Sequence, residues 1–382
     1  MGNGEGLNVA LVGVGFGAEF IPIYLHHPDV GRLTICDADA RLLAEKGDRF
    51  EVDRRTTRLD EILASDEIDA VHLVTPIPLH AEQTVAVLQS GKHCACTVPA
   101  ATAIDDLHAI VAAERRSGKR YMLMETAVYT RGFLMARRMR DSGEIGRIQF
   151  LRGAHYQDMQ NWPDYWQGLP PMHYATHAVS PLLALAGGRA VSVHCFGSGR
   201  MRDALTARYD NPYPAETAIF RLEDGLAAEV TRTLFHTARA YTEAFAVYGE
   251  NASFEWQQLE KEEDPVVFRM APLKPGRGRP VTAERIAPPD RQDLLPPEIA
   301  RFTQRGVYDE STPHLSFLQG GGHHGSHPHL VHEFVRSIVE DRPAAIDAVT
   351  AATWTAPGLC AHASALRNGE RVEIPDFGRR QA

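Results

Sequence analysis

Hydrophobic and polar residues alternate in two different ways along this chain, and the change comes near residue 125. Before it, short apolar runs at residues 8–12, 69–76 and 92–99 are separated by segments with helical spacing of apolar positions, such as 80–91. Strands that alternate with helices form a parallel sheet with helices on both faces. The pattern therefore predicts a doubly wound α/β domain over residues 1–125.

After residue 125 the apolar positions follow the two-residue period of strands. A helical segment at 130–142 leads into alternating runs at 148–157, 215–224 and 226–235. The pair Asp224-Gly225 separates the last two runs, and Asp-Gly in such a place is a strong hairpin signal. We therefore expect a second, α+β domain over residues 126–382, with an open and mostly antiparallel sheet.

The stretch from residue 260 to 322 is rich in Pro, Gly and charge. A connection of this length is expected to be an excursion near the site or an oligomer contact. Two helical segments, at 329–341 and 347–367, are expected to close the chain.

Composition narrows the class of protein. The chain has 382 residues, which suits two domains, and a formal net charge of −9, which argues against a surface that binds nucleic acid. No apolar run reaches the ~18 residues that span a bilayer. The first residues have neither a basic region nor an apolar core, so we expect a cytoplasmic protein. Its five cysteines have no zinc-type or redox-type spacing and are expected to be buried thiols.

A glycine-rich turn follows the first predicted strand. Gly13, Gly15 and Ala18 have the spacing of a dinucleotide-binding Rossmann loop. The next strand ends at Asp37, where an acidic residue accepts the adenosine ribose hydroxyls and repels a 2′-phosphate. The loop and the acid together predict NAD rather than NADP, with a glycine turn that binds nothing as the alternative.

Three further segments carry candidate chemistry. Residues 74–80 end one predicted strand and residues 91–101 end another, at the edge where doubly wound sheets bind cofactors. Residues 173–181 place two histidines and a tyrosine before a helix. With the glycine loop, these segments resemble the Gfo/Idh/MocA oxidoreductases over nearly the whole chain. The resemblance implies NAD-dependent chemistry on sugars, inositols or related polyols. It also implies cofactor contacts from Gly13, Gly15, Phe16, Gly17, Asp37, Thr75, Pro76, His80, Thr97, Val98 and Glu125.

One position departs from most dehydrogenases of that family. They carry Glu-Lys-Pro where this chain has Thr97-Val98-Pro99, and the lysine assists proton transfer to the reacting hydroxyl. The branch resembling glycoside hydrolase family 109 also has valine there. It shares residues 122–129, the Tyr-Ala-Thr-His run at 174–177 and the Gly-His-His-Gly run at 322–325. This resemblance implies NAD as a recycled catalytic group that cleaves a glycosidic bond without net oxidation.

Such a reaction needs groups that take and return protons. Tyr174 and His177 are three positions apart and share a face if the segment is helical. Histidine titrates near neutral pH, and tyrosine serves as acid or base when its neighbours tune it. We predict them as the catalytic pair, against the alternative of a core histidine and a packing tyrosine. Substrate contacts are predicted at His155, Tyr156, Trp166, His173, His324 and His327.

For the other candidate residues, a structural interpretation stands beside the functional one. His80 either lines a ligand or shapes its turn, and Glu125 is either a cofactor contact or an exposed carboxylate at a helix start. Histidines at 323, 324, 327 and 329 are compatible with a metal site, but Gly and Pro interrupt the segment and no carboxylate or cysteine joins within it. No metal is therefore predicted. An aromatic group is expected to form a lid or sugar platform, or an interface: Trp162, Tyr165 and Trp166. A set of arginines suits either an anionic sugar or a solvated surface: Arg131, Arg152, Arg200 and Arg232.

The sequence thus favours an NAD-dependent glycosidase acting on a small sugar glycoside. A sugar or polyol dehydrogenase that releases NADH is the alternative, and an NAD-binding sensor without activity is a third class. The resemblance also implies a homo-oligomer of two or more chains, because open-faced sheets in that family commonly pair face to face.

Overall fold

The computed structural model describes residues 6–259, 263–276, 278–308, 310–318 and 323–378. Its contacts divide the chain into two compact units. The first unit holds Met1–Tyr129, Asp290–Ala352 and Phe377–Ala382, and the second holds Thr130–Pro289 and Thr353–Asp376. The sequence prediction of consecutive domains at 1–125 and 126–382 differs from this division for residues 126–129, 290–352 and 377–382, which the contacts group with the first unit.

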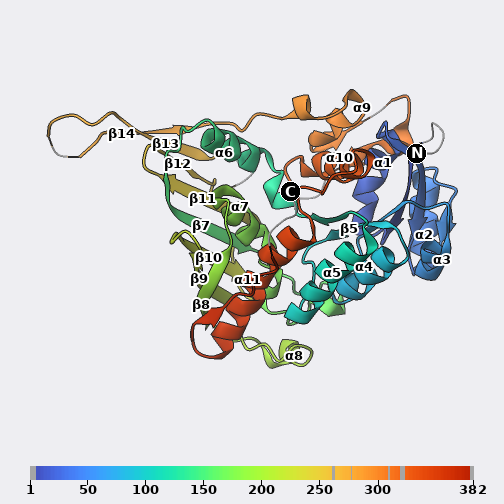
Figure 1. Cartoon of the computed structure of the whole chain (residues 1–382), viewed down its shortest axis with the longest axis horizontal. Helices are drawn as coiled ribbons and strands as arrows, with labels where there is room; N and C mark the ends of the chain where they lie inside the picture. Colours follow the sequence, from blue (N-terminus) through green and yellow to red (C-terminus); the bar gives the residue numbers. More distant parts are fainter. Residues whose placement is uncertain (1–5, 260–262, 277, 309, 319–322, 379–382) are drawn as a thin grey trace. The chain divides into compact units, whose positions relative to one another are not determined.

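The first unit is built on a parallel sheet with the strand order β3-β2-β1-β4-β5-β6. This order confirms the doubly wound prediction. Figure 1 shows α4 and α5 packed side by side and α10 beside α1. The strands are β1 (Leu7–Val12), β2 (Val30–Cys36), β3 (Arg55–Thr56), β4 (Ala70–Leu73), β5 (His93–Thr97) and β6 (Tyr121–Met124). The helices between them are η1 (Phe16–Phe20), α1 (Ile21–His26), α2 (Ala40–Arg49), α3 (Leu59–Ala64), η2 (Ile77–Leu79), α4 (His80–Gln89) and α5 (Ile104–Ser117), and η3 (Thr126–Val128) follows β6.

A late segment of the chain returns to complete this unit. Helix α10 (Ser326–Val339) packs against η1, α1 and η3, so its apolar face covers the start of the Rossmann domain. The N–H of Leu123 in β6 donates to the carbonyl of Ile346 at 3.0 Å. Arg336 pairs with Asp29 at 2.9 Å. This segment also contains η6 (Gln292–Leu294), α9 (Pro297–Ala300), η7 (Arg301–Thr303), β15 (Gly306–Val307), η8 (Pro313–Leu315) and β16 (Phe317–Leu318).

The second unit is built on a nine-stranded sheet with the order β14-β13-β12-β11-β7-β10-β9-β8-β17. Among the described strands of this second sheet only β10 and β7 pair in parallel, which confirms the mostly antiparallel prediction. Asp224-Gly225 forms the predicted hairpin, with Gly225 at φ 92°. The strands are β7 (Ile148–Tyr156), β8 (Ala190–Ser198), β9 (Ala215–Leu222), β10 (Ala227–Thr233), β11 (Thr242–Gly249), β12 (Ala252–Glu255), β13 (Val266–Met270), β14 (Val281–Arg285) and β17 (Val372–Glu373).

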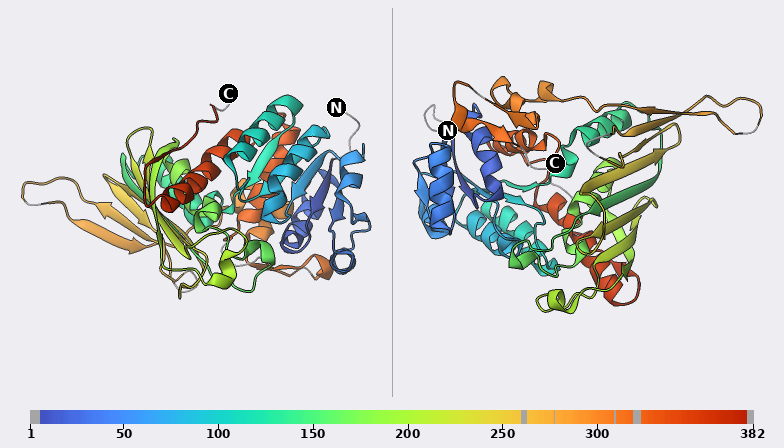
Figure 2. Two further views of the ribbon diagram at one scale, coloured as in Figure 1. Left: turned by 90° about the horizontal axis from the view of Figure 1, so that it is seen from below. Right: turned by 180° about the vertical axis from the view of Figure 1, so that it is seen from behind.

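Helix α7 (Thr176–Ala186) lies on this sheet against β7, β10 and β11. Gly153 in β7 allows the close approach, because a Cβ there would lie 2.3 Å from the carbonyl oxygen of Ala178. The other helical segments are α6 (Arg131–Asp141), η4 (Asp164–Trp166), η5 (Pro171–Tyr174) and α8 (Asp203–Thr206), while α11 (Ala348–Leu366) runs from the first unit into the second. Figure 2 shows the sheet as one twisted surface, with the β13–β14 hairpin projecting at one end of it.

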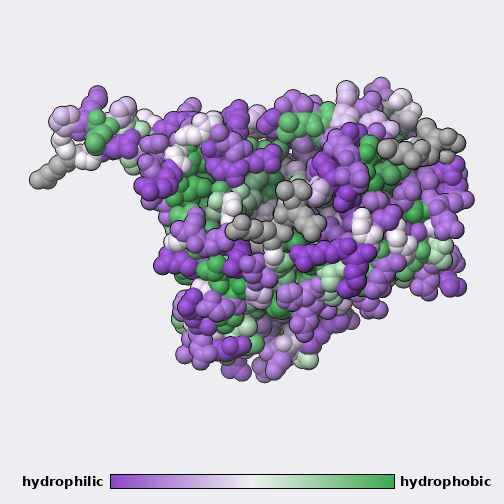
Figure 3. Space-filling view, viewed as in Figure 1, coloured by the Kyte–Doolittle hydropathy of each residue, from purple (hydrophilic) through white to green (hydrophobic). Residues whose placement is uncertain are grey.

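The visible surface in Figure 3 is mostly hydrophilic, with apolar residues in smaller groups. In the described part of the chain, no helix combines the length and apolar character needed to cross a membrane.

Candidate active site

The glycine loop between β1 and η1 is shaped by two close approaches. Gly13 has φ 91°, and a Cβ there would lie 2.3 Å from the carbonyl oxygen of Val74, so only glycine fits. A Cβ on Gly17 would lie 3.3 Å from the Val74 side chain. The tight packing of helix on strand, which the sequence spacing assigned to Ala18, is therefore made by Gly17.

Gly15 is the glycine that faces open space. A Cβ at this position, directly before the short helix η1, would meet no atom within 4 Å. Its neighbour Phe16 is 41% exposed. At the start of a helix, a residue without a side chain lets a pyrophosphate approach the backbone N–H groups. The loop therefore fits a dinucleotide.

Asp37 lies directly after β2 and holds this loop. Its Oδ2 accepts from the N–H of Val14 at 2.8 Å, and its Oδ1 accepts from the N–H of Asp39 at 2.9 Å. Each carboxylate oxygen accepts more than one hydrogen bond. Asp37 can therefore order the loop and still receive ribose hydroxyls.

His80, at the start of α4, joins two loops at the carboxyl edge of the sheet. Its Nε2 lies 2.7 Å from the carbonyl oxygen of Thr75, and its Nδ1 lies 2.8 Å from that of Pro99. Carbonyl oxygens only accept, so both ring nitrogens must donate and the ring must be an imidazolium. Burial lowers the pKa of His80, but the Cys96 thiol and the two carbonyls outweigh it and raise the pKa to about 9. His80 is 1% exposed, so it shapes the edge that the sequence assigned to the cofactor.

The remaining predicted cofactor residues lie on the same sheet edge or just beyond it. Thr75 donates to Gln83 at 2.6 Å and is followed by Pro76, and Thr97 donates to the carbonyl of Leu73 at 3.3 Å. Val98 is 7% exposed and precedes Pro99 in a cis peptide bond.

Glu125 follows β6 and caps η3, because its Oε1 accepts from the N–H of Ala127 at 2.9 Å. Glu125 therefore starts a helical turn, but it is 0% exposed, so the alternative of an exposed carboxylate is wrong.

The second unit contains a row of charged and polar residues across one face of its sheet. The strand register places Glu243 of β11 beside His155 of β7, His155 beside Arg232 of β10, and Arg232 beside Glu216 of β9. His155, Arg232 and Glu216 are 0% exposed, and the Glu243 side chain is 3% exposed. Burying so many ionisable groups is costly unless they satisfy one another, so this row is a candidate functional centre.

Tyr174 and His177 meet above this row. Tyr174 ends η5 and His177 is the second residue of α7, and the phenol oxygen lies 3.4 Å from His177 Nε2. The same Nε2 lies 3.6 Å from Oε1 of Glu243. The hydroxyl of Tyr241 donates to this Oε1, and burial together with Glu243 raises the pKa of Tyr241. The arrangement links two phenols and an imidazole through one carboxylate.

Arg232 holds the backbone beneath Tyr174. It donates to the carbonyls of Tyr174 at 2.9 Å and His155 at 3.1 Å, and to Oε1 of Gln157 at 2.9 Å. Its guanidinium lies 5.4 Å from the centre of the Tyr174 ring. Burial lowers the pKa of Arg232 to about 10, so it stays a cation at neutral pH. Its contacts are carbonyls inside the unit, which favours a structural charge over a surface for an anionic sugar.

Glu216 fixes the segment that leads to Tyr174. Its Oε2 accepts from the N–H of Met172 at 2.8 Å, and its Oε1 lies 2.7 Å from Nδ1 of His362. The ring of His173 lies 5.0 Å from that of His362, and burial and this neighbour lower the pKa of His173 to about 3. The structure therefore places His173, a predicted substrate contact, in a supporting network.

Of the other predicted substrate contacts in the second unit, His155 and Trp166 lie near Tyr174, whereas Tyr156 does not. His155 lies within 6.0 Å of the Tyr174, His177 and Tyr241 rings. Tyr156 follows it on the strand and so points to the opposite face, where Arg239 lies over its ring. Trp166 packs edge-on against Tyr174 at 4.8 Å, and it also contacts Trp162 and Tyr165.

Two of the other arginines considered for an anionic sugar have carboxylate partners. Arg152 pairs with Glu229 at 3.2 Å, and Arg200 lies 3.6 Å from Asp203.

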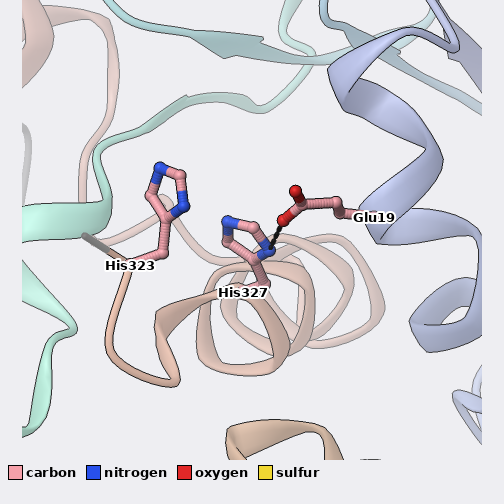
Figure 4. A group of neighbouring side chains, drawn as sticks. All are labelled: Glu19, His323 and His327. Atoms are coloured by element: carbon pink, nitrogen blue, oxygen red, sulfur yellow. Dashed lines mark ion pairs between the residues drawn. The ribbon is translucent and has the colours of Figure 1, made fainter. Parts of the chain in front are cut away.

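His327 and His324, also predicted as substrate contacts, belong to the first unit. His327 lies beside His323 and is 3.4 Å from Glu19, which follows the glycine loop (Figure 4). Burial, His323 and His72 lower the pKa of His327. His324 has φ 40° and is not a member of this cluster.

Sequence reasoning missed Glu216, Tyr241 and Glu243. A signal was present for Glu216, because it occupies the inward phase of an alternating strand with Ala218 and Phe220. Glu243 shares a face with Phe245, but β11 is buried on both faces and does not alternate. A charged residue in the apolar phase of a strand marks either a buried network or a site. Their partners lie on strands distant in sequence, so only the pairing identifies them.

Comparison with known proteins agrees with this geometry. Residues 7–125 match the oxidoreductase family with an NAD-binding Rossmann fold, and residues 133–255 match the GFO/IDH/MocA C-terminal domain. A glycosyl hydrolase family 109 protein of Saccharopolyspora erythraea is 22% identical over 98% of this chain and 84% of its own length. A protein of the same name from Streptomyces niveus is 25% identical over 98% of this chain and 78% of its own length.

Solved structures share the fold. Levoglucosan dehydrogenase in complex with NADH and levoglucosan superposes with a TM-score of 0.77 at 21% identity, covering 97% of this chain and 100% of that one. An oxidoreductase domain protein from Kribbella flavida gives 0.74 at 19% identity, covering 98% and 100%. With its Rossmann loop, its second-unit sheet and these matches over most of its length, the chain belongs to the Gfo/Idh/MocA oxidoreductase family, and residues 7–125 form an NAD-binding Rossmann domain.

Proposed function

We propose that this protein is an NAD-dependent glycosidase, which cleaves a sugar glycoside through transient oxidation at carbon 3. The observation that carries the proposal is the Tyr174–His177 pair backed by the carboxylate of Glu243. It supplies proton-handling groups in a chain that has Val98 where most dehydrogenases of the family have a lysine. Full-length relatives named glycosyl hydrolase family 109 proteins support the same assignment.

The reaction balances with water as the only consumed co-reactant. Oxidation of the carbon-3 hydroxyl to a ketone acidifies the proton on carbon 2. Loss of that proton expels the aglycone from carbon 1, which takes up a proton as it leaves. Water then adds across carbons 1 and 2, and reduction of the ketone restores the carbon-3 hydroxyl. The products are the free sugar and the aglycone, with no net oxidation.

Bound NAD supplies the acceptor and donor of the two electrons at carbon 3. Residues of the first unit would hold it: the loop of Gly13 and Gly15 would take the pyrophosphate, and Asp37 the ribose hydroxyls. His80 keeps two loops of the sheet edge in place through its carbonyl hydrogen bonds.

Protons move through the second unit. Tyr174 keeps intermediate exposure, whereas the His177 and Glu243 side chains are 4% and 3% exposed. A proton taken up at the Tyr174 oxygen passes to His177 Nε2, and the Glu243 carboxylate stabilises the imidazolium that results. The cation of Arg232, 5.4 Å from the Tyr174 ring centre, stabilises negative charge that develops on the phenol.

The substrate class is a small sugar glycoside, bound with the help of Trp166, whose flat ring suits a sugar face. We also propose that the chain works as a homo-oligomer of two or more copies. The test is a panel of nitrophenyl glycosides, followed at once for released nitrophenol and for absorbance at about 340 nm, where NADH absorbs. Nitrophenol release that requires NAD, without accumulating NADH, supports the glycosidase. Sustained formation of one NADH per sugar oxidised would instead assign the protein as a dehydrogenase.

A further inference from the structure

A carboxylate and two imidazoles meet in the first unit. Glu19 comes from η1, directly after the glycine loop, while His323 precedes α10 and His327 lies in its first turn. One ligand atom from each residue lies within 4.8 Å of the other two, and His327 Nδ1 is 3.4 Å from Oε2 of Glu19. Figure 4 shows the three side chains side by side, with His327 between His323 and Glu19. One of the sequence arguments against a metal was that no carboxylate or cysteine joins within the histidine segment, and Glu19 supplies a carboxylate from the other end of the chain.

We propose that Glu19, His323 and His327 bind one divalent transition-metal ion of the zinc class. Imidazole nitrogen and carboxylate oxygen bind Zn²⁺ at about 2.0–2.2 Å, so two ligands of one tetrahedral ion lie about 3.3–3.5 Å apart. The His327–Glu19 separation of 3.4 Å already has this value. Two imidazoles favour zinc and its neighbours over Mg²⁺ and Ca²⁺, which prefer oxygen ligands. Three protein ligands leave a fourth position for water or a small anion.

The surroundings fix the two histidine rings. The Phe20 ring lies 4.5 Å from the His327 ring, and the Phe16 ring lies 5.2 Å from the His323 ring. His327 is 0% exposed. Ligands that are held by packing lose little freedom when they bind an ion, which favours affinity. The ion would connect the glycine loop to the start of α10 inside one unit.

A simple ion pair is the competing explanation, and the chain offers its matched example. His314 lies 3.5 Å from Glu51 in the same unit, with one imidazole and one carboxylate. The His314–Glu51 pair offers only two ligands, whereas Glu19, His323 and His327 offer three. We therefore expect removal of His314 to leave metal affinity unchanged and removal of Glu19 or His323 to weaken it.

The test uses the full chain purified without a histidine tag and stripped with a chelator. Calorimetric titration with Zn²⁺ and absorption spectra with Co²⁺ would be recorded for the wild type and for the Glu19→Gln, His323→Ala and His314→Ala variants. The wild type and His314→Ala are expected to bind one ion per chain with a tetrahedral Co²⁺ spectrum, and Glu19→Gln and His323→Ala at least about tenfold more weakly. Circular dichroism checks that each variant is folded.

Absence of a one-to-one site in the wild type would overturn the proposal. Equal affinity in the wild type, Glu19→Gln and His323→Ala would overturn it too, because the ion would then be bound elsewhere. Neither result bears on the glycosidase assignment, which is tested by product formation. Excess Mg²⁺ should not displace the ion, and displacement by Mg²⁺ would refute the zinc-class assignment.

Discussion

His80 should be a buried cation at neutral pH, and this can be measured. Its two ring nitrogens face the carbonyls of Thr75 and Pro99, and its pKa is raised from 6.5 to about 9. A pKa that is higher in the folded state means that the folded state binds the proton more tightly. Protonated His80 therefore contributes its full stabilisation of the folded state below pH 6.5, and this contribution is lost as the pH rises through about 9. Since one pH unit corresponds to about 1.4 kcal/mol, the full effect is about 3 kcal/mol.

The perturbation is His80→Gln, which cannot carry the charge. We expect the stability gap between wild type and variant to narrow by about 3 kcal/mol between pH 6 and pH 10. Urea unfolding, followed through methyl NMR signals of Ala70, Val71 and Leu73 in β4, reports on the first unit alone. In protein labelled with ¹⁵N-histidine, the His80 ring should show two protonated nitrogens at pH 7. Its signal is assigned by its loss in the variant.

A second variant separates the two causes of the raised pKa. Cys96→Ala removes the neighbouring thiol but leaves both carbonyls in place. We expect a lower pKa that still keeps the ring protonated at pH 7, because two carbonyl acceptors require two donors. A neutral His80 ring at pH 7 in the wild type, or a stability gap that does not change with pH, would refute the reasoning.

Three further predictions concern the reaction and the cofactor. Tyr174→Phe and His177→Ala should each lower turnover by ~10²–10⁴ while NAD affinity, measured by calorimetry, stays unchanged, and full activity in either variant would remove that residue from the mechanism. Glu243→Gln should lower turnover by about 10² or more and shift the pH–rate profile, since an amide stabilises the imidazolium poorly, and an unchanged profile would show that Glu243 is only structural. Asp37→Ser with Ala38→Arg should move the preference in binding titrations from NAD toward NADP, and an unchanged preference would mean that the ribose is recognised elsewhere.

The fold of the first unit could be predicted because its signals are local. Apolar runs, helical spacing and the glycine loop each depend on neighbouring residues. Even there, the pattern could not distinguish Gly17 from Ala18 as the residue packed against Val74, since that depends on a contact between η1 and the residue that follows β4. The return of residues 290–352 to the first unit was not predictable, because the apolar face of α10 indicates burial without naming the surface that covers it.

The candidate site shows the same limit. Tyr174 and His177 could be singled out because they are close in sequence. Glu243 could not be joined to them, because its position depends on the register between β11 and β7. Glu19 and His323 likewise come from opposite ends of the chain and meet only through the packing of α10 on η1.

Isotope incorporation during turnover tests the central claim most directly. The protein would be incubated with a cleaved nitrophenyl glycoside and NAD in deuterated water, and the released sugar examined by NMR and mass spectrometry. Removal of the carbon-2 proton followed by addition of water predicts deuterium at carbon 2, together with nitrophenol release and no net NADH. Sugar without deuterium, accompanied by one NADH per turnover, would contradict the account.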